Sequence, residues 1–582
     1  MKKLLALFLT LCMLLSVVSV MSVNVGADGE TADATALTPD TAWYDDHKEE
    51  TDLYIGTAAE LLGFSKLIST ELNANNVNSD FETVDASLKK FAGKTIHITA
   101  DIDLNPGWTA GETAPLNKWL ADAYHCFTGM IDGGGHTISG IYLSTTVNHT
   151  GIFGNLKGGT EEKPVGVKNL AIINSYITSN QNNFGGLFGA IPATEAGKNR
   201  FALIENVYLD IEQIFTFGAN ATVHNTNTGG VIGYISPGNT VTIRNTVVAS
   251  SIITPSENNH NRPVGGFVGH AEGGTAIIND SLFSGVVKSY YNRVAGFVGY
   301  VTKKGTATIN HCIEAGDIYP GTGTFDLNGH GSIIGVSEGS GSSIKNCIYT
   351  DIYYAPKGSF VKISNLYGEP NSSDKLTAET NVNNIYVPDD EVYGIGMLDK
   401  LTTAGMTDWT VTTTGTPLPR SIVTTFGETI LAKADKAETP VTKLAGYQVS
   451  NAADNKFDLR LVATLKLADD NKTVTDGKVS NYTAVGFRVV ANYGTTTKSK
   501  DYTTDMVYSA ISGYTKGETA VTEYTAESLG GDYLFVLPCR NVPANAGVIT
   551  MEVTTYYTAA DGTVVLGATQ VFTVNPAATE LH

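Results

Sequence analysis

Hydrophobic and small residues recur along this chain in one short phrase, in which two apolar residues are framed by glycines. The closing glycines of six such phrases are 35, 44, 36, 30 and 36 residues apart. A period of this length predicts stacked coils, because a single coil cannot bury its hydrophobic face alone. We expect the apolar pair to point inward and the glycines to form the coil corners. The phrases end at Gly154, Gly189, Gly233, Gly269, Gly299 and, in degenerate form, Gly335.

A second phrase accompanies the first and consists of an aliphatic residue, any residue, and then Asn, Asp or His. Its third positions are 37, 39, 35, 31 and 35 residues apart, so the two phrases keep step. Asn and Asp tolerate left-handed backbone and bond to their own main chain, which suits a corner. Each repeat is therefore predicted to be a parallel coil of about three short strands, with a polar ladder along one corner. The ladder would comprise Asn169, Asn206, Asn245, Asp280, His311 and Asn346.

The segments on either side of the repeats follow other patterns. Thr57-Ala58-Ala59-Glu60 is a capping box, and Leu61, Phe64 and Ile68 follow on one helical face. This amphipathic helix would cap the first coil. From Leu444 long strands of alternating polarity predict an antiparallel, immunoglobulin-like β-sandwich. The expected order is a signal peptide (1–27), a leader (28–50), an N-terminal cap (51–93), a β-helix (94–365), a cap or tail over the last coil (366–425), a linker (426–443) and the sandwich (444–578).

The first 27 residues determine the expected location. A basic start at Lys2 and Lys3, an apolar run from Leu4 and the small residues before Ala27 are typical of a secretory signal peptide. The protein is therefore expected to be secreted, with retention at the cell surface left open, and without membrane insertion. Without the two lysines, 58 acidic against 36 basic residues give a net charge of −22, which excludes nucleic acid as a partner. We expect a monomer.

Two of the cysteines stand in register. Cys12 leaves with the signal peptide, and Cys312 and Cys347 directly follow the corner residue in adjacent repeats. They should be neighbours in adjacent coils, either as a disulfide or as two stacked, reduced thiols. The sequence leaves both readings open.

The repeats resemble the GLUG motif of exported bacterial proteins, a right-handed parallel β-helix element, over roughly residues 50 to 425. The preceding Phe91 to Ile96, Asp101 to Asn105 and Phe127 to His136 resemble the usual start of such helices. In that family the repeat occurs in surface adhesins and beside protease domains, and it is not known as a catalytic site. The chain has no His-Glu-x-x-His, so the zinc-protease branch is excluded. The C-terminal domain resembles an accessory β-sandwich of exported clostridial proteins. The resemblance implies an all-β fold, a right-handed β-helix followed by a sandwich.

Candidate catalytic groups are few. Gly329-His330-Gly331 resembles one polygalacturonase motif, but the paired carboxylates that such hydrolysis needs are absent from the two preceding coils. A coil corner explains His330 equally well. Asp101 and Asp103 lie on one face of a predicted strand and could hold Ca²⁺, although strand-end solvation is the commoner role. No cofactor is expected, with Ca²⁺ left open.

Tyrosines in the last coils are the stronger candidates, because exposed rings stack on sugars or on apolar protein surfaces. The alternative is that some of them point into the core. The predicted binding residues are Tyr290, Tyr291, Tyr353 and Tyr354, in a group that also includes Tyr300. We therefore expect a non-catalytic, adhesin-like protein that binds a glycan or a host or neighbouring-cell protein. The alternatives are a polysaccharide lyase or glycoside hydrolase, and a structural spacer.

Overall fold

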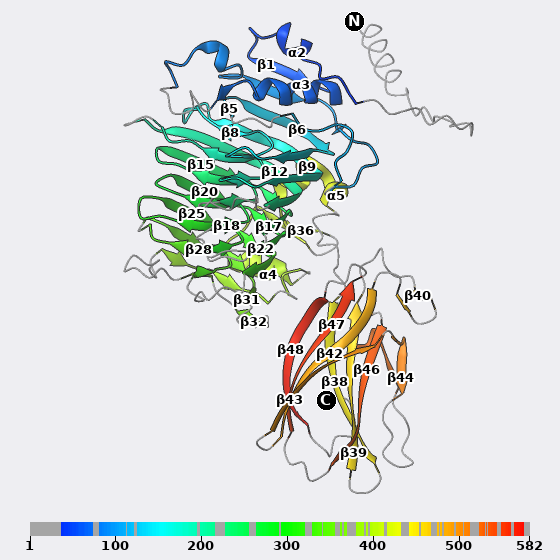
Figure 1. Ribbon diagram of the computed structural model, residues 1–582. Coiled ribbons are helices and arrows are strands. Elements are labelled where there is room, and N and C mark those ends of the chain that lie inside the picture. Colours follow the sequence, from blue (N-terminus) through cyan, green and yellow to red (C-terminus); the bar gives the residue numbers. More distant parts are fainter. Residues whose placement is uncertain are drawn as a thin grey trace, which may run out of the picture.

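The computed structural model of the protein describes residues 36–574 apart from internal gaps (Figure 1). The signal-peptide prediction therefore lies outside the described residues. The gaps are 74–80, 112, 121–124, 195–197, 216–226, 255–262, 290–292, 321–328, 340, 355–360, 364–365, 369–379, 389–390, 394–395, 413–415, 432–440, 453–455, 467–473, 476–477, 480–481, 494–495, 505, 513–522, 530, 532, 544–548 and 560–563.

The larger part of the fold is a parallel β-solenoid of about six turns, as predicted. Successive coils pair in constant register, for example Ile243 with Ile278, and Ile278 with Ile309. The line before the polar corner contains β1 (Asp52–Ile55), β3 (Thr95–Ile98), β6 (Met130–Ser139), β9 (Val165–Ser179), β12 (Arg200–Phe215), β15 (Asn239–Arg244), β20 (Thr275–Asn279), β25 (Thr306–Asn310), β29 (Ser343–Lys345) and β34 (Asn381–Val382). β6, β9 and β12 continue through this corner.

Short strands complete each coil. After the corner come β4 (Ile102–Asp103), β16 (Val247–Val248), β21 (Leu282–Phe283), β26 (Ile313–Glu314), β30 (Ile348–Tyr349) and β35 (Ile385–Tyr386), and then β7 (Tyr142–Thr145), β17 (Ser251–Thr254), β22 (Val286–Ser289) and β27 (Asp317–Pro320). A two-residue line follows with β10 (Phe184–Gly185), β13 (Thr228–Gly229), β18 (Val264–Gly265) and β23 (Val294–Ala295). The last line is a six-stranded parallel sheet of β11 (Phe188–Ile191), β14 (Ile232–Ile235), β19 (Val268–Ala271), β24 (Val298–Val301), β28 (Ile334–Ser337) and β33 (Tyr367–Gly368).

The repeated apolar pairs fill the solenoid. Phe267 and Phe297, for example, are fully buried and stack with ring centroids 4.6 Å apart. The closing glycines, however, serve close packing more than corner geometry, since only Gly154 of the six has a positive φ. A Cβ on Gly269 would lie 2.6 Å from the carbonyl oxygen of Gly233, so the neighbouring coil leaves no room for a side chain.

The start of the solenoid is covered as the sequence indicated. α3 (Ala58–Ile68) begins with the predicted capping box at Thr57 and buries Leu61, Phe64 and Ile68. α2 (Ala42–Asp45) lies beside it and contributes Trp43 to the same core. β2 (Leu72–Asn73), β5 (His125–Phe127) and β8 (Asn155–Leu156) form a small sheet in this part.

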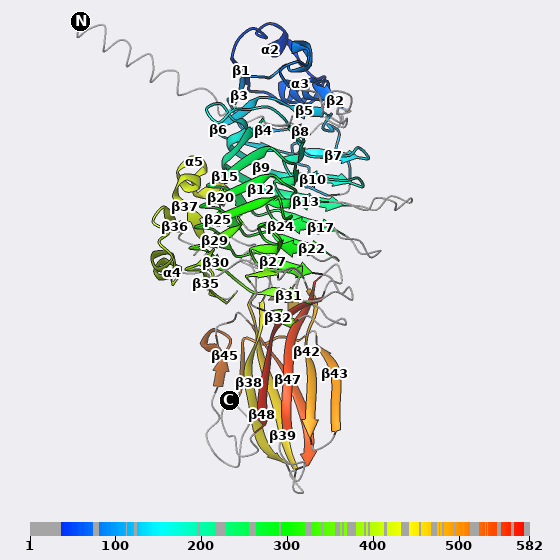
Figure 2. The same ribbon diagram turned by 90° about the vertical axis from the view of Figure 1, so that its left-hand side faces the viewer.

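After the last coil the chain runs back along the side of the solenoid. This segment, the strap (residues 387–426), contains α4 (Met397–Thr403), β36 (Trp409–Val411), β37 (Pro417–Pro419) and the first part of α5 (Arg420–Leu431). Figure 2 shows it beside the coils, with α4 near the last of them and α5 near β6 and β15. Its buried side chains pack on an outward row of the coils. That row consists of Ala171, Tyr208, Val247, Leu282, Ile313 and Ile348. The tail thus contacts many coils, and not the last one alone.

The C-terminal part forms antiparallel sheets with a core of their own. One sheet contains β38 (Val441–Ala452), β39 (Lys456–Lys466) and β46 (Tyr533–Pro543), and the other contains β43 (Thr496–Thr504), β42 (Tyr482–Tyr493), β47 (Ile549–Ala559) and β48 (Val564–Val574). Side chains from both sheets share one buried cluster, including Leu461 and Val553. Two smaller hairpins in this part are β40 (Val474–Thr475) with β41 (Lys478–Val479) and β44 (Ala510–Ser512) with β45 (Glu523–Thr525). A third small hairpin, β31 (Ile352–Tyr354) with β32 (Val361–Ile363), belongs to the last coils of the solenoid.

Candidate functional site

The polar corner residues stack at one corner of the coils, and several of them are hydrogen-bonded from coil to coil. All six have left-handed backbone, with φ between 46° at Asp280 and 55° at Asn206. Asn169 Nδ2 donates to Asp132 Oδ1 at 3.0 Å, and Asn206 Nδ2 donates to Asn169 Oδ1 at 3.0 Å. Asn383 continues the ladder with φ 57° and donates to Asn346 Oδ1 at 3.2 Å. The sequence pattern missed this seventh corner because Asn381 stands at the aliphatic position.

The candidate metal and catalytic residues bond within the chain. Asp101 Oδ1 accepts from the Thr137 amide at 2.9 Å and lies 3.3 Å from His136 Nδ1. Asp103 Oδ1 accepts from the Asn105 amide at 3.0 Å. Among the described residues, no group of three or more His, Cys, Asp or Glu side chains could hold a metal ion. His330 is 1% exposed, and burial lowers its pKa to about 4.

The structure describes little of the four tyrosines that the sequence predicted as binding residues. Tyr290 and Tyr291 lie outside the described residues. Tyr353 and Tyr354 belong to β31, where their backbones pair with Lys362 and Val361 of β32. The structure therefore describes no contact of these four side chains, and they stay a prediction.

A different aromatic row lies on the outside of the sheet that contains β14, β19 and β24. Tyr234, His270 and Tyr300 are paired in register across three successive coils. The ring centroids of Tyr234 and His270 are 5.3 Å apart, and those of His270 and Tyr300 are 4.8 Å apart. Ile235, Ala271 and Val301, which directly follow the three residues, point into the core, so the row lies on the outer side of the sheet, where Tyr300 is 8% exposed. We call Tyr234, His270 and Tyr300 the aromatic row.

Arg293 completes one end of the aromatic row. Its Cζ lies 3.8 Å from the ring centroid of Tyr300, which is the geometry of a cation–π contact. Its φ is 70°, a left-handed conformation that a long side chain rarely adopts and that marks functional positions more often than chance. Arg293 directly follows residues 290–292, where the sequence placed two of its binding tyrosines.

A chain of polar side chains leads to His270. Asn183 Nδ2 donates to His149 Nδ1 at 2.8 Å, and Asn227 Nδ2 donates to Asn183 Oδ1 at 2.6 Å. The free Asn227 Oδ1 therefore accepts from His270 Nδ1, at 3.1 Å. This order assigns the proton of His270 to Nδ1 and leaves a lone pair on Nε2, a buried atom that has no partner among the described residues. Burial, and then the charge of Arg293, lower the pKa of His270 to about 3, so the imidazole is neutral.

Carboxylates flank the aromatic row. The Tyr234 hydroxyl donates to Glu272, and the Tyr300 hydroxyl is hydrogen-bonded to Glu338. Each tyrosine thus meets a glutamate from the next coil. Burial raises the pKa of Tyr300; the charge of Arg293 opposes this shift, and Glu338 adds to it. The face combines ring edges, a guanidinium donor and two carboxylates.

The sequence held a signal for this row that the search for clustered tyrosines did not use. The residue after each closing glycine falls at one structural position, and it is aromatic in three consecutive coils, after Gly233, Gly269 and Gly299. Clustering along the chain identified Tyr300 alone, because successive members of the row are 36 and 30 positions apart. Alignment by the repeat would have found all three.

No family model matches the chain, and no curated protein matches it. Among solved structures, the chain is similar to a putative immunoglobulin A1 protease from Bacteroides ovatus, with 16% sequence identity and a TM-score of 0.41. The match covers 64% of this chain and 92% of that chain. A similarity of this degree carries no argument about function. No described helix has the length and apolar character needed to cross a membrane.

Proposed function

We propose that this is a secreted, non-catalytic protein that binds an extended, neutral glycan along the aromatic row. The observation that supports it most directly is the in-register alignment of Tyr234, His270 and Tyr300 on an outer face. The signal-peptide pattern of the first 27 residues supports secretion. The resemblance of the repeats to the GLUG motif supports an adhesin-like role, because that repeat is not known as a catalytic site.

The chemistry of the face suits a sugar. The C–H face of a pyranose packs on aromatic rings, while hydroxyl groups need both donors and acceptors nearby. Arg293 can only donate hydrogen bonds, and the carboxylates of Glu272 and Glu338 can only accept them. A sugar hydroxyl group can satisfy both kinds of partner, whereas a carboxylate on the ligand cannot donate to either glutamate. Glu272 and Glu338, together with the negative net charge, also disfavour an acidic glycan.

The spacing of the row favours a polymer over a single sugar. Coils repeat at roughly the distance between strands, about 4.8 Å. This is close to the length of one pyranose in an extended chain, so a polysaccharide parallel to the solenoid axis would present one sugar per coil. The lyase or hydrolase alternative keeps Asp101, Asp103 and His330 as its residues, but these groups are bonded within the chain or buried.

The test is a glycan-array and polysaccharide pull-down screen of the chain from residue 28 onward. We expect binding of neutral polysaccharides without new reducing ends or unsaturated products. Tyr234→Ala and His270→Ala should each weaken binding about tenfold or more, the usual cost at a central contact residue. Tyr54→Ala is the matched control, since Tyr54 is 57% exposed on another face of the solenoid.

Other results would contradict the proposal. Product formation would indicate an enzyme and move attention to Asp101, Asp103 and His330. Loss of binding in Tyr54→Ala but not in Tyr234→Ala would place the site on another face. Absence of binding to every glycan, with folded protein, would favour the spacer reading.

A further inference from the structure

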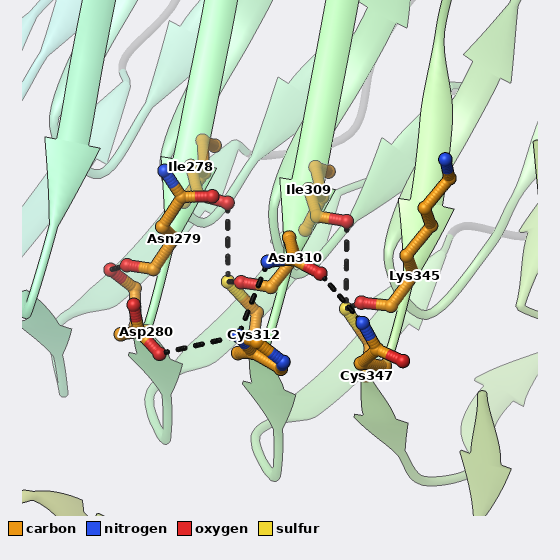
Figure 3. A network of polar contacts seen from close by, with 11 residues as sticks. Ile278, Asn279, Asp280, Ile309, Asn310, Cys312, Lys345 and Cys347 are labelled. Atoms are coloured by element: carbon orange, nitrogen blue, oxygen red, sulfur yellow. Dashed lines mark hydrogen bonds and ion pairs between the residues drawn. The ribbon is translucent and has the colours of Figure 1, made fainter. Parts of the chain in front are cut away.

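Cys312 and Cys347 lie one above the other inside the solenoid. The residues that follow them, Ile313 and Ile348, are paired in parallel register. Both cysteines are 0% exposed and both are free thiols. Each thiol points toward the preceding coil, with Cys312 Sγ 3.5 Å from the Ile278 carbonyl oxygen and Cys347 Sγ 3.8 Å from that of Ile309 (Figure 3).

The two cysteines are also close enough to influence each other, since Cys347 contributes to the raised pKa of the Cys312 thiol, after burial. Adjacent strands place paired Cα atoms at roughly 4.8 Å, within the roughly 4.4–6.8 Å range over which disulfides form. Ser281 has the equivalent position one coil earlier, where its hydroxyl donates to the Asn279 carbonyl oxygen at 2.7 Å. Cys312 and Cys347 therefore stand at an internal position where the preceding coil has the hydroxyl side chain of Ser281.

The coil of Cys312 has a charged residue at a core position. Glu314 occupies the position that is Val248 and Phe283 in the preceding coils, and it is fully buried. Its carboxylate accepts from the Ser332 hydroxyl at 2.5 Å and from the Thr350 hydroxyl at 3.0 Å. Ser332 stands where the other phrases have glycine. A covalent link at Cys312 would therefore join two coils beside a core position where a charged side chain replaces an apolar one.

We infer that Cys312 and Cys347 are a disulfide-forming site that clamps two successive coils when the protein meets a low-molecular-weight disulfide. In the exchange, one thiol loses its proton and attacks the small disulfide, which releases one small thiol and forms a mixed disulfide. The second cysteine, also deprotonated, then displaces the other small thiol and closes the Cys312–Cys347 bond. The small disulfide is reduced by two electrons, and the cysteine pair is oxidised by two.

Burial determines when this reaction takes place. The fully buried thiols are closed to a small disulfide in the folded state, so exchange requires local opening of the last coils or occurs before they form. Oxidation should therefore be slow for the folded protein and efficient during refolding. The resulting link closes a loop of one coil and stabilises by restricting the unfolded chain.

The experiment refolds the full chain in mixtures of oxidised and reduced glutathione, followed by mass spectrometry and peptide mapping without reduction. The expected product is lighter by two hydrogens, contains a Cys312–Cys347 cross-linked peptide, and has a Tm several degrees above the reduced protein. The matched variants are Cys312→Ser and Cys347→Ser, and Ser281 shows that a hydroxyl is accommodated at this position. Cys126→Ser is the control outside the pair.

Two results would overturn the inference. One is that all thiols can be alkylated after unfolding of the oxidant-treated protein. The other is that oxidant raises the Tm of Cys312→Ser as much as that of the parent chain. A failure of glycan binding would leave this inference standing, because the thiols lie inside the solenoid and the aromatic row lies outside.

Discussion

Two rows of outward-facing side chains follow the same coil-to-coil register on this solenoid, but they differ in chemistry and in what lies against them. The row from Ala171 through Val247 to Ile348 is apolar and is covered by the strap. The aromatic row of Tyr234, His270 and Tyr300 carries polar ring atoms and is flanked by Glu272, Glu338 and Arg293. Among the described residues, the hydrophobic cluster that joins the strap to the coils includes none of these six residues.

The difference shows how a repeat protein separates stability from recognition. Because the register is constant, an apolar residue at one outward position of every coil produces a continuous apolar stripe along the solenoid. Such a stripe must be buried. The strap satisfies that requirement within the chain. A row that keeps hydrogen-bonding groups among its rings needs no such cover, and it can meet a ligand instead. We therefore assign stability to the first row and propose binding for the second.

The largest expected effect is on the covered row. Trp409 is 2% exposed and lies in the cluster that joins the strap to the coils. Trp409→Ala should lower the free energy of unfolding by about 3–5 kcal/mol, because it removes a large buried side chain and leaves a cavity. Chemical denaturation monitored by circular dichroism measures this. Glycan binding per folded molecule should not change.

Leu398→Ala is the matched control on the same strap, since Leu398 is 48% exposed. It should change stability by less than about 0.5 kcal/mol. If Trp409→Ala abolished binding while the protein stayed folded, the separation between the two rows would be wrong.

A second prediction uses pH. Glu71 is fully buried, accepts from the Thr128 hydroxyl at 2.8 Å and from the Phe91 amide at 3.1 Å, and burial raises its pKa to about 8. Because the folded-state pKa exceeds the unfolded value of 4.5, its contribution to stability is fully present below about pH 4.5 and is lost as the pH rises through 8. Glu71→Gln should therefore be more stable than the parent at pH 9, by on the order of a few kcal/mol.

Thermal unfolding of both proteins between pH 4 and pH 9 gives the comparison, and their curves should converge at the acid end. Binding should not follow this profile, since His270 stays neutral far above its pKa of about 3. Parallel loss of binding and stability as the pH rises would link the aromatic row to the N-terminal cap and contradict the separation.

The sequence predicted the features that repeat and missed those that depend on which side of a strand faces out. The apolar pairs and the corners at Asn169 or Asp280 gave the coil, because close packing restricts those positions in every repeat. The strap was expected only over the last coil, since the outward apolar positions Val247 and Leu282 cannot be told from core positions by hydrophobicity. The aromatic row was missed because its members are neighbours only after stacking.

A smaller effect is expected at the polar corner. Asn169 has φ 53°, donates to Asp132 and accepts from Asn206. Asn169→Ala should cost about 1–3 kcal/mol, from the left-handed backbone and the broken ladder. Asn169→Gly keeps the backbone freedom and should cost less. Equilibrium unfolding of the two variants separates the terms, and equal losses would show that backbone conformation contributes nothing there.

The smallest effect concerns a third outward row, which is charged. Arg244 and Glu205 are paired in register and form an ion pair at 2.6 Å, with side chains 48% and 26% exposed. Exposed pairs contribute little, so Glu205→Gln should change stability by less than about 1 kcal/mol, and the change should disappear at high salt. Glycan binding should be unaffected. If Glu205→Gln lost glycan binding, and if that loss depended on the salt concentration, the charged row and not the aromatic row would be the recognition surface.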